Sequence, residues 1–199
     1  MTWIKTIDFK DAEGELKSLY ERVKAPSGHI DNILQAHSLR PRTLAAHLAL
    51  YKATIHTKPN GLLPRERELV GVCVSLLNGC DYCVEHHRAG LARHLGSTLL
   101  ALELSDATVG KRDSAHLTDR ERALCIYATK LTKTPAEMQA SDLTPLRMVG
   151  LDDAGILDLN QIVAYFAYAN RTVLGLGVST SGELLGLHPD ENEEGFKHK

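Results

Sequence analysis

The chain has 199 residues, of which 43% are hydrophobic and 24% charged, and its formal net charge is -2. This length suits one domain, or a domain built from two similar halves, with enough apolar residues for a sizeable core. A charge so close to balance does not favour binding to nucleic acid or to an anionic membrane surface.

No pattern in the sequence predicts a secretory signal or a membrane-spanning helix. No stretch approaches the ~20 uninterrupted apolar residues that a spanning helix needs. The N-terminal segment MTWIKTIDFKDAEGE turns acidic at once and lacks the apolar region of a secretory signal. We therefore expect a cytoplasmic protein without a membrane partner. In that compartment a CxxC pair is more often catalytic or metal-binding than structural.

Helix formers dominate, and no sustained alternation of apolar and polar residues indicates strands. The sequence therefore predicts an all-α fold. Its expected helices, in chain order, span residues 11–24, 30–37, 41–56, 64–78, 80–94, 97–105, 118–133 and 152–174, with a loop over 106–114. A polar tail at 189–199 is expected to fray.

Several helix ends have clear local signals. Asp11 is the expected cap of the first helix. Pro41 and Pro64 suit a first helical position, and Thr118 with Glu121 makes a capping box. We interpret residues 1–199 as a single domain with an N-terminal helical extension over 1–32.

A faint internal repeat runs through the chain. The segment LLPRERELVGV near Leu62 resembles LTDRERALCIY near Leu117, and each opens a helix after a loop. The shared RER is short. If it reflects a duplication, the chain holds two related helical units, of which only the first carries a CxxC.

The chemically informative segment places Cys80 and Cys83 in the first turn of a helix, directly after the Asn78-Gly79 break. Positions three apart share a helix face, so the two sulfurs can approach each other. Unpaired backbone N–H groups and the helix dipole favour a thiolate there. His87 lies one turn beyond Cys83 and can accept or stabilise the thiol proton.

A carboxylate that orients His87 would complete a proton relay. Glu68 is the candidate, because its helix must pack against the CxxC helix through the tight turn. Glu66 is the rival, but it points to another part of its helix. Such a site can reduce a peroxide: a thiolate attacks the distal oxygen, the second cysteine traps the sulfenic acid as a disulfide, and an external dithiol restores the pair.

Other interpretations stay open for these residues. Cys80 and Cys83 could be buried small side chains, and Glu68 could pair with Arg65 or Arg67. Cys80, Cys83, His87 and Glu68 could also bind zinc, although no second half of a zinc site is present. We expect core roles for Cys73 and Cys125. Four histidines are expected at structural or exposed positions: His47, His56, His94 and His116. Three aromatic residues are expected in core or subunit contacts: Tyr165, Phe166 and Tyr168.

The spacing Glu68-x11-Cys80-x2-Cys83-x3-His87 resembles the signature of the AhpD-like alkylhydroperoxidases within the carboxymuconolactone decarboxylase superfamily. The segments LNGCDYCVEHH and AYFAYANRTVLGLGV are similar to its peroxidase-related branch. The resemblance covers roughly residues 33–178, and only the central motif is specific. AhpD-type enzymes can have a histidine immediately before the second cysteine, whereas this chain has Tyr82; His86 occupies a different helical position.

The resemblance implies an all-α fold with a duplicated helical unit, assembled as a homo-oligomer, either a trimer or a dimer-based hexamer. It implies that Cys83 attacks the peroxide, Cys80 resolves the intermediate, and His87 with Glu68 relays the proton. The expected partners are an organic hydroperoxide and an external dithiol reductant. No flavin, haem or dinucleotide motif indicates a cofactor. The alternatives are a decarboxylase or lactone-type enzyme of the same superfamily, and a non-enzymatic thiol redox sensor.

Overall fold

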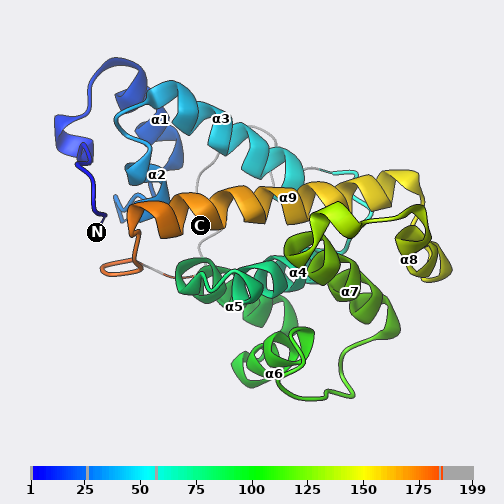
Figure 1. The fold of residues 1–199 in the computed structure, drawn as a ribbon. Helices are drawn as coiled ribbons and strands as arrows, with labels where there is room; N and C mark the ends of the chain where they lie inside the picture. The colour runs from blue at the N-terminus through cyan, green and yellow to red at the C-terminus, as the bar shows by residue number, and fades with distance from the viewer. Residues whose placement is uncertain (1, 26, 57, 184, 186–199) are drawn as a thin grey trace. The chain divides into compact units, whose positions relative to one another are not determined.

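The computed structural model describes residues 2–25, 27–56, 58–183 and 185, and within these ranges it is helical, without a strand (Figure 1). The α-helices are α1 (Gly14–Val23), α2 (Asn32–Ala36), α3 (Pro41–Tyr51), α4 (Pro64–Leu77), α5 (Asp81–Leu95), α6 (Thr98–Thr108), α7 (Asp119–Lys133), α8 (Thr144–Met148) and α9 (Asp153–Leu176). Short 3-10 turns are η1 (Phe9–Asp11), η3 (Pro135–Glu137) and η4 (Ala140–Leu143), and a π-helical turn, η2 (Lys52–His56), extends α3. The predicted all-α class is confirmed.

Three of the four helix starts with a local signal lie where the sequence predicts them. Pro41 and Pro64 are the first residues of α3 and α4. The Thr118 hydroxyl accepts from the Glu121 backbone N–H at the start of α7. The expected cap at Asp11 is wrong: Asp11 ends the η1 turn, and α1 begins after Glu13.

Two further boundaries differ from the prediction. Helix α6 continues to Thr108, so the expected loop over 106–114 starts later. The five-residue helix α8 is absent from the prediction.

The chain divides into two compact units: residues 1–57 with 171–199, and residues 58–170. The expected N-terminal extension over 1–32 lies within the first unit. The expected polar tail at 189–199 lies outside the described residues.

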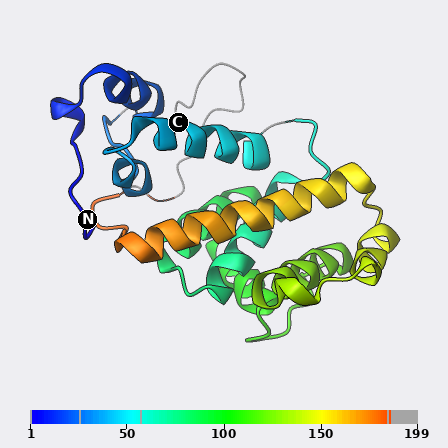
Figure 2. The ribbon, with the colours of Figure 1, turned by 45° about the horizontal axis from the view of Figure 1, so that its top comes forward.

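The first unit buries one face of α1 against α2 and α3, the blue and cyan helices of Figure 2. The apolar face of α1 is buried in this cluster, which contains Leu16, Leu19, Tyr20, Val23, Ile30, Leu34, Leu44 and Leu48. The Tyr20 hydroxyl donates to the Ile7 carbonyl over 3.0 Å, so the buried ring keeps a polar partner.

In the second unit, α4 packs against α5 and α7, and α5 packs against α6. Their shared core contains Leu69, Cys73, Leu91, Ala101, Leu104, Leu117 and Cys125. The yellow part of α9 runs along this group in Figures 1 and 2. A Cβ atom at Gly71 of α4 would overlap the Phe166 ring of α9, so a glycine is required where the two helices meet.

The repeated RER motif joins α4 to α7 through two reciprocal ion pairs. Arg65 Nη2 lies 2.6 Å from Glu121 Oε1, and Arg120 Nε lies 2.8 Å from Glu66 Oε1. The second oxygen of each glutamate accepts the backbone N–H at the start of its own helix, from Leu63 or Thr118. The two motifs therefore have equivalent roles, as expected of two related helical units.

Within the described part of the chain, no helix combines the length and the apolar composition needed to cross a bilayer.

Candidate active site

The turn between α4 and α5 places the CxxC motif. Gly79 has a φ of +67°, a conformation that suits glycine, and it reverses the chain after α4. The Cys80 backbone N–H then donates to the Ser75 carbonyl over 2.9 Å. Cys80 is the N-cap of α5, and Cys83 lies in its first turn. Both side chains are buried thiols, and no disulfide joins them.

The surroundings of Cys80 favour its thiolate. A hydrogen bond with the Cys83 thiol lowers the pKa of Cys80 against the opposing effect of burial, and the Asn170 side chain adds a further hydrogen bond. Asn170 is fully buried in α9. Its Nδ2 donates to Ser75 Oγ over 3.1 Å, and its Oδ1 accepts from Asn78 Nδ2 over 2.9 Å. These bonds fix the amide that faces Cys80.

Glu68 and His87 form the other half of the site. His87 Nδ1 lies 2.8 Å from Glu68 Oε2, and the two side chains are only 13% and 4% exposed. A carboxylate can only accept, so Nδ1 carries the proton of this bond. The lone pair of the neutral ring is then on Nε2, on a side chain one helical turn beyond Cys83. The structure thus brings Glu68 and His87 together, as the sequence predicts.

Two close contacts hold this pair in place. A Cβ atom at Gly90 would lie 2.8 Å from Cδ and Oε1 of Glu68, so the glycine leaves room for the carboxylate between α4 and α5. The Phe166 ring packs edge-on against the His87 ring, with centroids 4.6 Å apart and an interplanar angle of 84°. The imidazole is therefore oriented by a carboxylate and by an aromatic ring.

The rival carboxylate has a different role. Glu66 binds Arg120 and the first N–H of its own helix, so it contributes to packing between α4 and α7. Arg65, one proposed ion-pair partner of Glu68, pairs with Glu121 instead.

Tyr82, the residue immediately before Cys83, is buried. Its ring packs against that of His86, with centroids 4.7 Å apart. His86 therefore lies beside Tyr82, one turn along α5.

The zinc interpretation of this motif gains no support. Within the described residues, the one group of three or more metal-ligand side chains whose donor atoms lie within 4.8 Å of one another is His29, Asp31 and Glu183. Cys80, Cys83, His87 and Glu68 do not form such a group.

Cys73 and Cys125, which look isolated in the sequence, are neighbours. Cys73 Sγ lies 3.8 Å from both the Thr108 carbonyl oxygen and Thr129 Oγ1. A hydrogen bond with Cys73, together with burial, raises the pKa of Cys125 well above its usual value. Both thiols belong to the core of the second unit, in agreement with the predicted core role. Cys125 also lines a pocket of about 510 Å³ beside α6 and α7.

Sequence reasoning missed three residues around the site, Gly71, Gly90 and Asn170, and it predicted only a core or subunit contact for Phe166. A glycine inside a helix lowers helix stability by about 1 kcal/mol relative to alanine. Gly71 and Gly90 inside predicted helices therefore indicated positions of close packing. Asn170 had none, because its partners are distant in sequence.

Comparisons with known proteins bear on the family and the fold of the chain. Residues 41–129 match the family model described as the Carboxymuconolactone decarboxylase family. A peroxidase-related protein from Silicibacter sp. TM1040 is 28% identical, with a TM-score of 0.67 over 76% of this chain and 77% of that one. The chain is thus similar to the Carboxymuconolactone decarboxylase family over residues 41–129 and to an AhpD-like peroxidase-related structure over most of its length.

Other AhpD-like structures share the fold. The alkylhydroperoxidase AhpD core of a peroxidase-related protein from Ralstonia eutropha JMP134 has a TM-score of 0.77 at 24% identity, over 89% of this chain and 91% of that one. A variant of the debrominase Bmp8, in complex with 2,3,4-tribromopyrrole, has a TM-score of 0.69 at 16% identity, over 90% and 91%. A comparison with curated proteins gives no match.

Proposed function

We propose that this AhpD-like protein is a thiol peroxidase that reduces organic hydroperoxides through a Cys80–Cys83 disulfide cycle. The observation that carries the proposal is the Glu68–His87 hydrogen bond of 2.8 Å, next to a buried dithiol at a helix start. Peroxide reduction by a thiol requires a dithiol whose surroundings stabilise the thiolate, and a base held in a fixed orientation.

The cycle has three balanced steps. His87 accepts the Cys83 proton, the Cys83 thiolate attacks the distal peroxide oxygen, and the O–O bond breaks. The leaving alkoxide takes the proton from His87, so the products are an alcohol and a Cys83 sulfenic acid. The Cys80 sulfur then attacks the Cys83 sulfur, so that the Cys80–Cys83 disulfide forms and water is released. An external dithiol reduces this disulfide by exchange and is itself oxidised.

The surroundings of the two cysteines support this division of roles. His87 is one turn from Cys83 and serves it as a base. Cys80 has the lowered pKa, so its thiolate is available to attack the sulfenic acid. During reduction, a thiol of low pKa is also the better leaving group, which directs the external dithiol to Cys83.

A homo-oligomer and an external dithiol reductant belong to the same proposal, because the AhpD-like resemblance implies both. The chain needs no cofactor for this cycle, since the electrons come from the dithiol.

Peroxide consumption with a dithiol reductant tests the proposal, with the wild type compared with Cys83→Ser. We expect turnover by the wild type and none above background by the variant. Equal rates would overturn the proposal. Turnover of a muconolactone by a Cys80→Ser/Cys83→Ser variant would instead identify lactone chemistry, and an oxidation-dependent change in oligomeric size without peroxide turnover would identify a redox sensor.

The position of the sulfenic acid tests the two roles separately. With a sulfenic-acid trap present, Cys80→Ser should be labelled at Cys83 after addition of peroxide. Labelling of Cys83→Ser at Cys80 would reverse the assignment of attacking and resolving thiols.

A further inference from the structure

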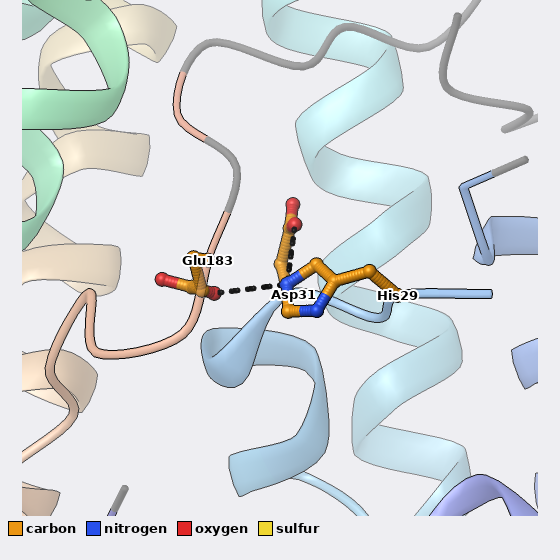
Figure 3. Close-up of side chains that lie close together, drawn as sticks. All are labelled: His29, Asp31 and Glu183. Atoms are coloured by element: carbon orange, nitrogen blue, oxygen red, sulfur yellow. Dashed lines mark ion pairs between the residues drawn. The ribbon is translucent and has the colours of Figure 1, made fainter. Parts of the chain in front are cut away.

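Three metal-ligand side chains converge in the first unit, where the peroxidase proposal uses no residue. His29 Nε2 lies 3.8 Å from Asp31 Oδ1 and 3.9 Å from Glu183 Oε1. All three donor atoms lie within 4.8 Å of one another. Figure 3 shows both carboxylates directed toward the imidazole, Glu183 from the C-terminal segment and Asp31 from the start of α2.

Backbone and side-chain bonds hold these residues in place. The Ala25 N–H donates to the His29 carbonyl over 2.8 Å, which closes the turn that presents the imidazole. Asn32, the next residue after Asp31, donates through Nδ2 to the Ser179 carbonyl over 2.8 Å, and its backbone N–H donates to Glu183. Segments about 150 residues apart in sequence are thus joined at the site.

The imidazole has an unsatisfied buried atom. Within the described chain, His29 Nε2 is buried and makes no hydrogen bond, and its distances to the carboxylates exceed hydrogen-bond range. The side chains of Asp31 and Glu183 are 16% and 0% exposed, so two carboxyl groups face each other with little water to screen them. A buried imidazole nitrogen without a hydrogen bond, beside two partly buried carboxylates, is an environment that a cation stabilises.

The spacing also fits one metal ion. Two ligands bonded at about 2.1 Å to one ion lie about 3.0 to 4.2 Å apart for bond angles between 90° and 180°. The measured 3.8 and 3.9 Å fall inside this range. A nitrogen ligand disfavours Ca²⁺ and Mg²⁺, which take oxygen, and favours the later first-row divalent metals.

We propose that His29, Asp31 and Glu183 bind one divalent transition-metal ion of the class that Zn²⁺ represents. The bound ion connects the turn before α2 to the segment around Glu183, and so fastens the C-terminal part of the first unit to its N-terminal part. This site is separate from the Cys80–Cys83 dithiol and does not depend on the proposed peroxidase activity.

Calorimetric titration with Zn²⁺ tests the site. The parent should be the Cys80→Ser/Cys83→Ser variant of the full chain, stripped with a chelator, so that zinc cannot bind the dithiol. We expect one Zn²⁺ per chain, with an affinity at least tenfold lower in His29→Ala, Asp31→Asn and Glu183→Gln. The matched control is His116→Ala, which removes an exposed histidine that pairs with Glu103 over 3.2 Å, and it should bind as the parent does.

A second measurement keeps the test informative if a variant folds poorly. Hydrogen exchange at residues 179–183 should slow at least tenfold when Zn²⁺ is added to the parent, and should not respond in Glu183→Gln, an isosteric change in the C-terminal segment. Absence of zinc binding by the parent, or unchanged binding by all three variants, would overturn the proposal and leave a histidine–carboxylate ion pair as the role of the cluster.

Discussion

His87 Nδ1 lies 2.8 Å from Glu68 Oε2, and this bond joins α5 to α4 one helical turn beyond Cys83. It fixes the proton on Nδ1 and leaves Nε2 as the basic atom. The predictions below test the parts of this arrangement in turn.

Glu68→Gln should remove most of the proton transfer through His87 while keeping the size and shape of the side chain. The amide does not hold the imidazole in one tautomer and does not stabilise an imidazolium. General acid–base catalysis contributes about 10²- to 10⁴-fold, so we expect kcat/KM for an organic hydroperoxide to fall by about 10²-fold. The control is Glu103→Gln, in the exposed Glu103–His116 pair, which should leave kcat/KM unchanged. A similar loss in both variants would show that the effect is not specific to the relay.

Gly90→Ala should disturb the Glu68–His87 hydrogen bond by a steric contact from α5. Its Cβ would meet the Glu68 carboxyl group at 2.8 Å, so either the carboxylate or α5 must move. We expect a lower kcat/KM and a loss of about 1 to 3 kcal/mol in the free energy of unfolding. Gly175→Ala in α9 is the matched control: its Cβ has no neighbour within 4 Å among the described residues, so helix propensity should make it neutral or slightly stabilising. Wild-type activity in Gly90→Ala would contradict the packing argument.

Asn170→Ala should raise the pKa of Cys80, because it removes a hydrogen bond that stabilises the thiolate. The pH dependence of alkylation, followed at Cys80 by peptide mass spectrometry, measures this shift. Asn160→Ala, on the same helix, removes a hydrogen bond of 3.0 Å to Tyr127 and should leave the profile unchanged. An unchanged profile in Asn170→Ala would exclude it as a positioning residue.

His47 should make the fold sensitive to acid. Burial, aided by the neighbouring His37, lowers the pKa of His47 from 6.5 to about 3. Between these values the unfolded chain binds a proton that the folded chain does not, so stability falls as the pH drops below 6.5. From pH 7 to pH 5 this amounts to about 2 kcal/mol. Denaturant unfolding at both pH values should show a smaller loss in His47→Leu than in the wild type, and equal losses would contradict the assignment.

The sequence predicted those features that depend on nearby residues. Pro41, Pro64 and the Thr118–Glu121 box mark their helix starts because each acts within one turn. The Glu68–His87 contact was predictable because the Asn78-Gly79 turn brings two consecutive helices together. The reciprocal Arg65–Glu121 and Arg120–Glu66 pairs were not, since a shared RER motif does not show which residues face each other.

Residues brought in from distant segments escaped prediction. Asn170 reaches Ser75 and Cys80 from α9, and no local pattern distinguishes it from other helical asparagines. The same holds for Glu183, which meets His29 only through the tertiary fold. Cys73 and Cys125 likewise look isolated in the sequence and become neighbours only through the packing of α4 against α7.

A single-turnover experiment tests the central claim most directly. Reduced protein is mixed with one equivalent of an organic hydroperoxide, without external reductant, and the alcohol and the Cys80–Cys83 peptide are measured together. The account predicts one equivalent of alcohol and a peptide lighter by two hydrogens, linked by a disulfide. Intact thiols after mixing, or equal alcohol formation by the Cys80→Ser/Cys83→Ser variant, would contradict it.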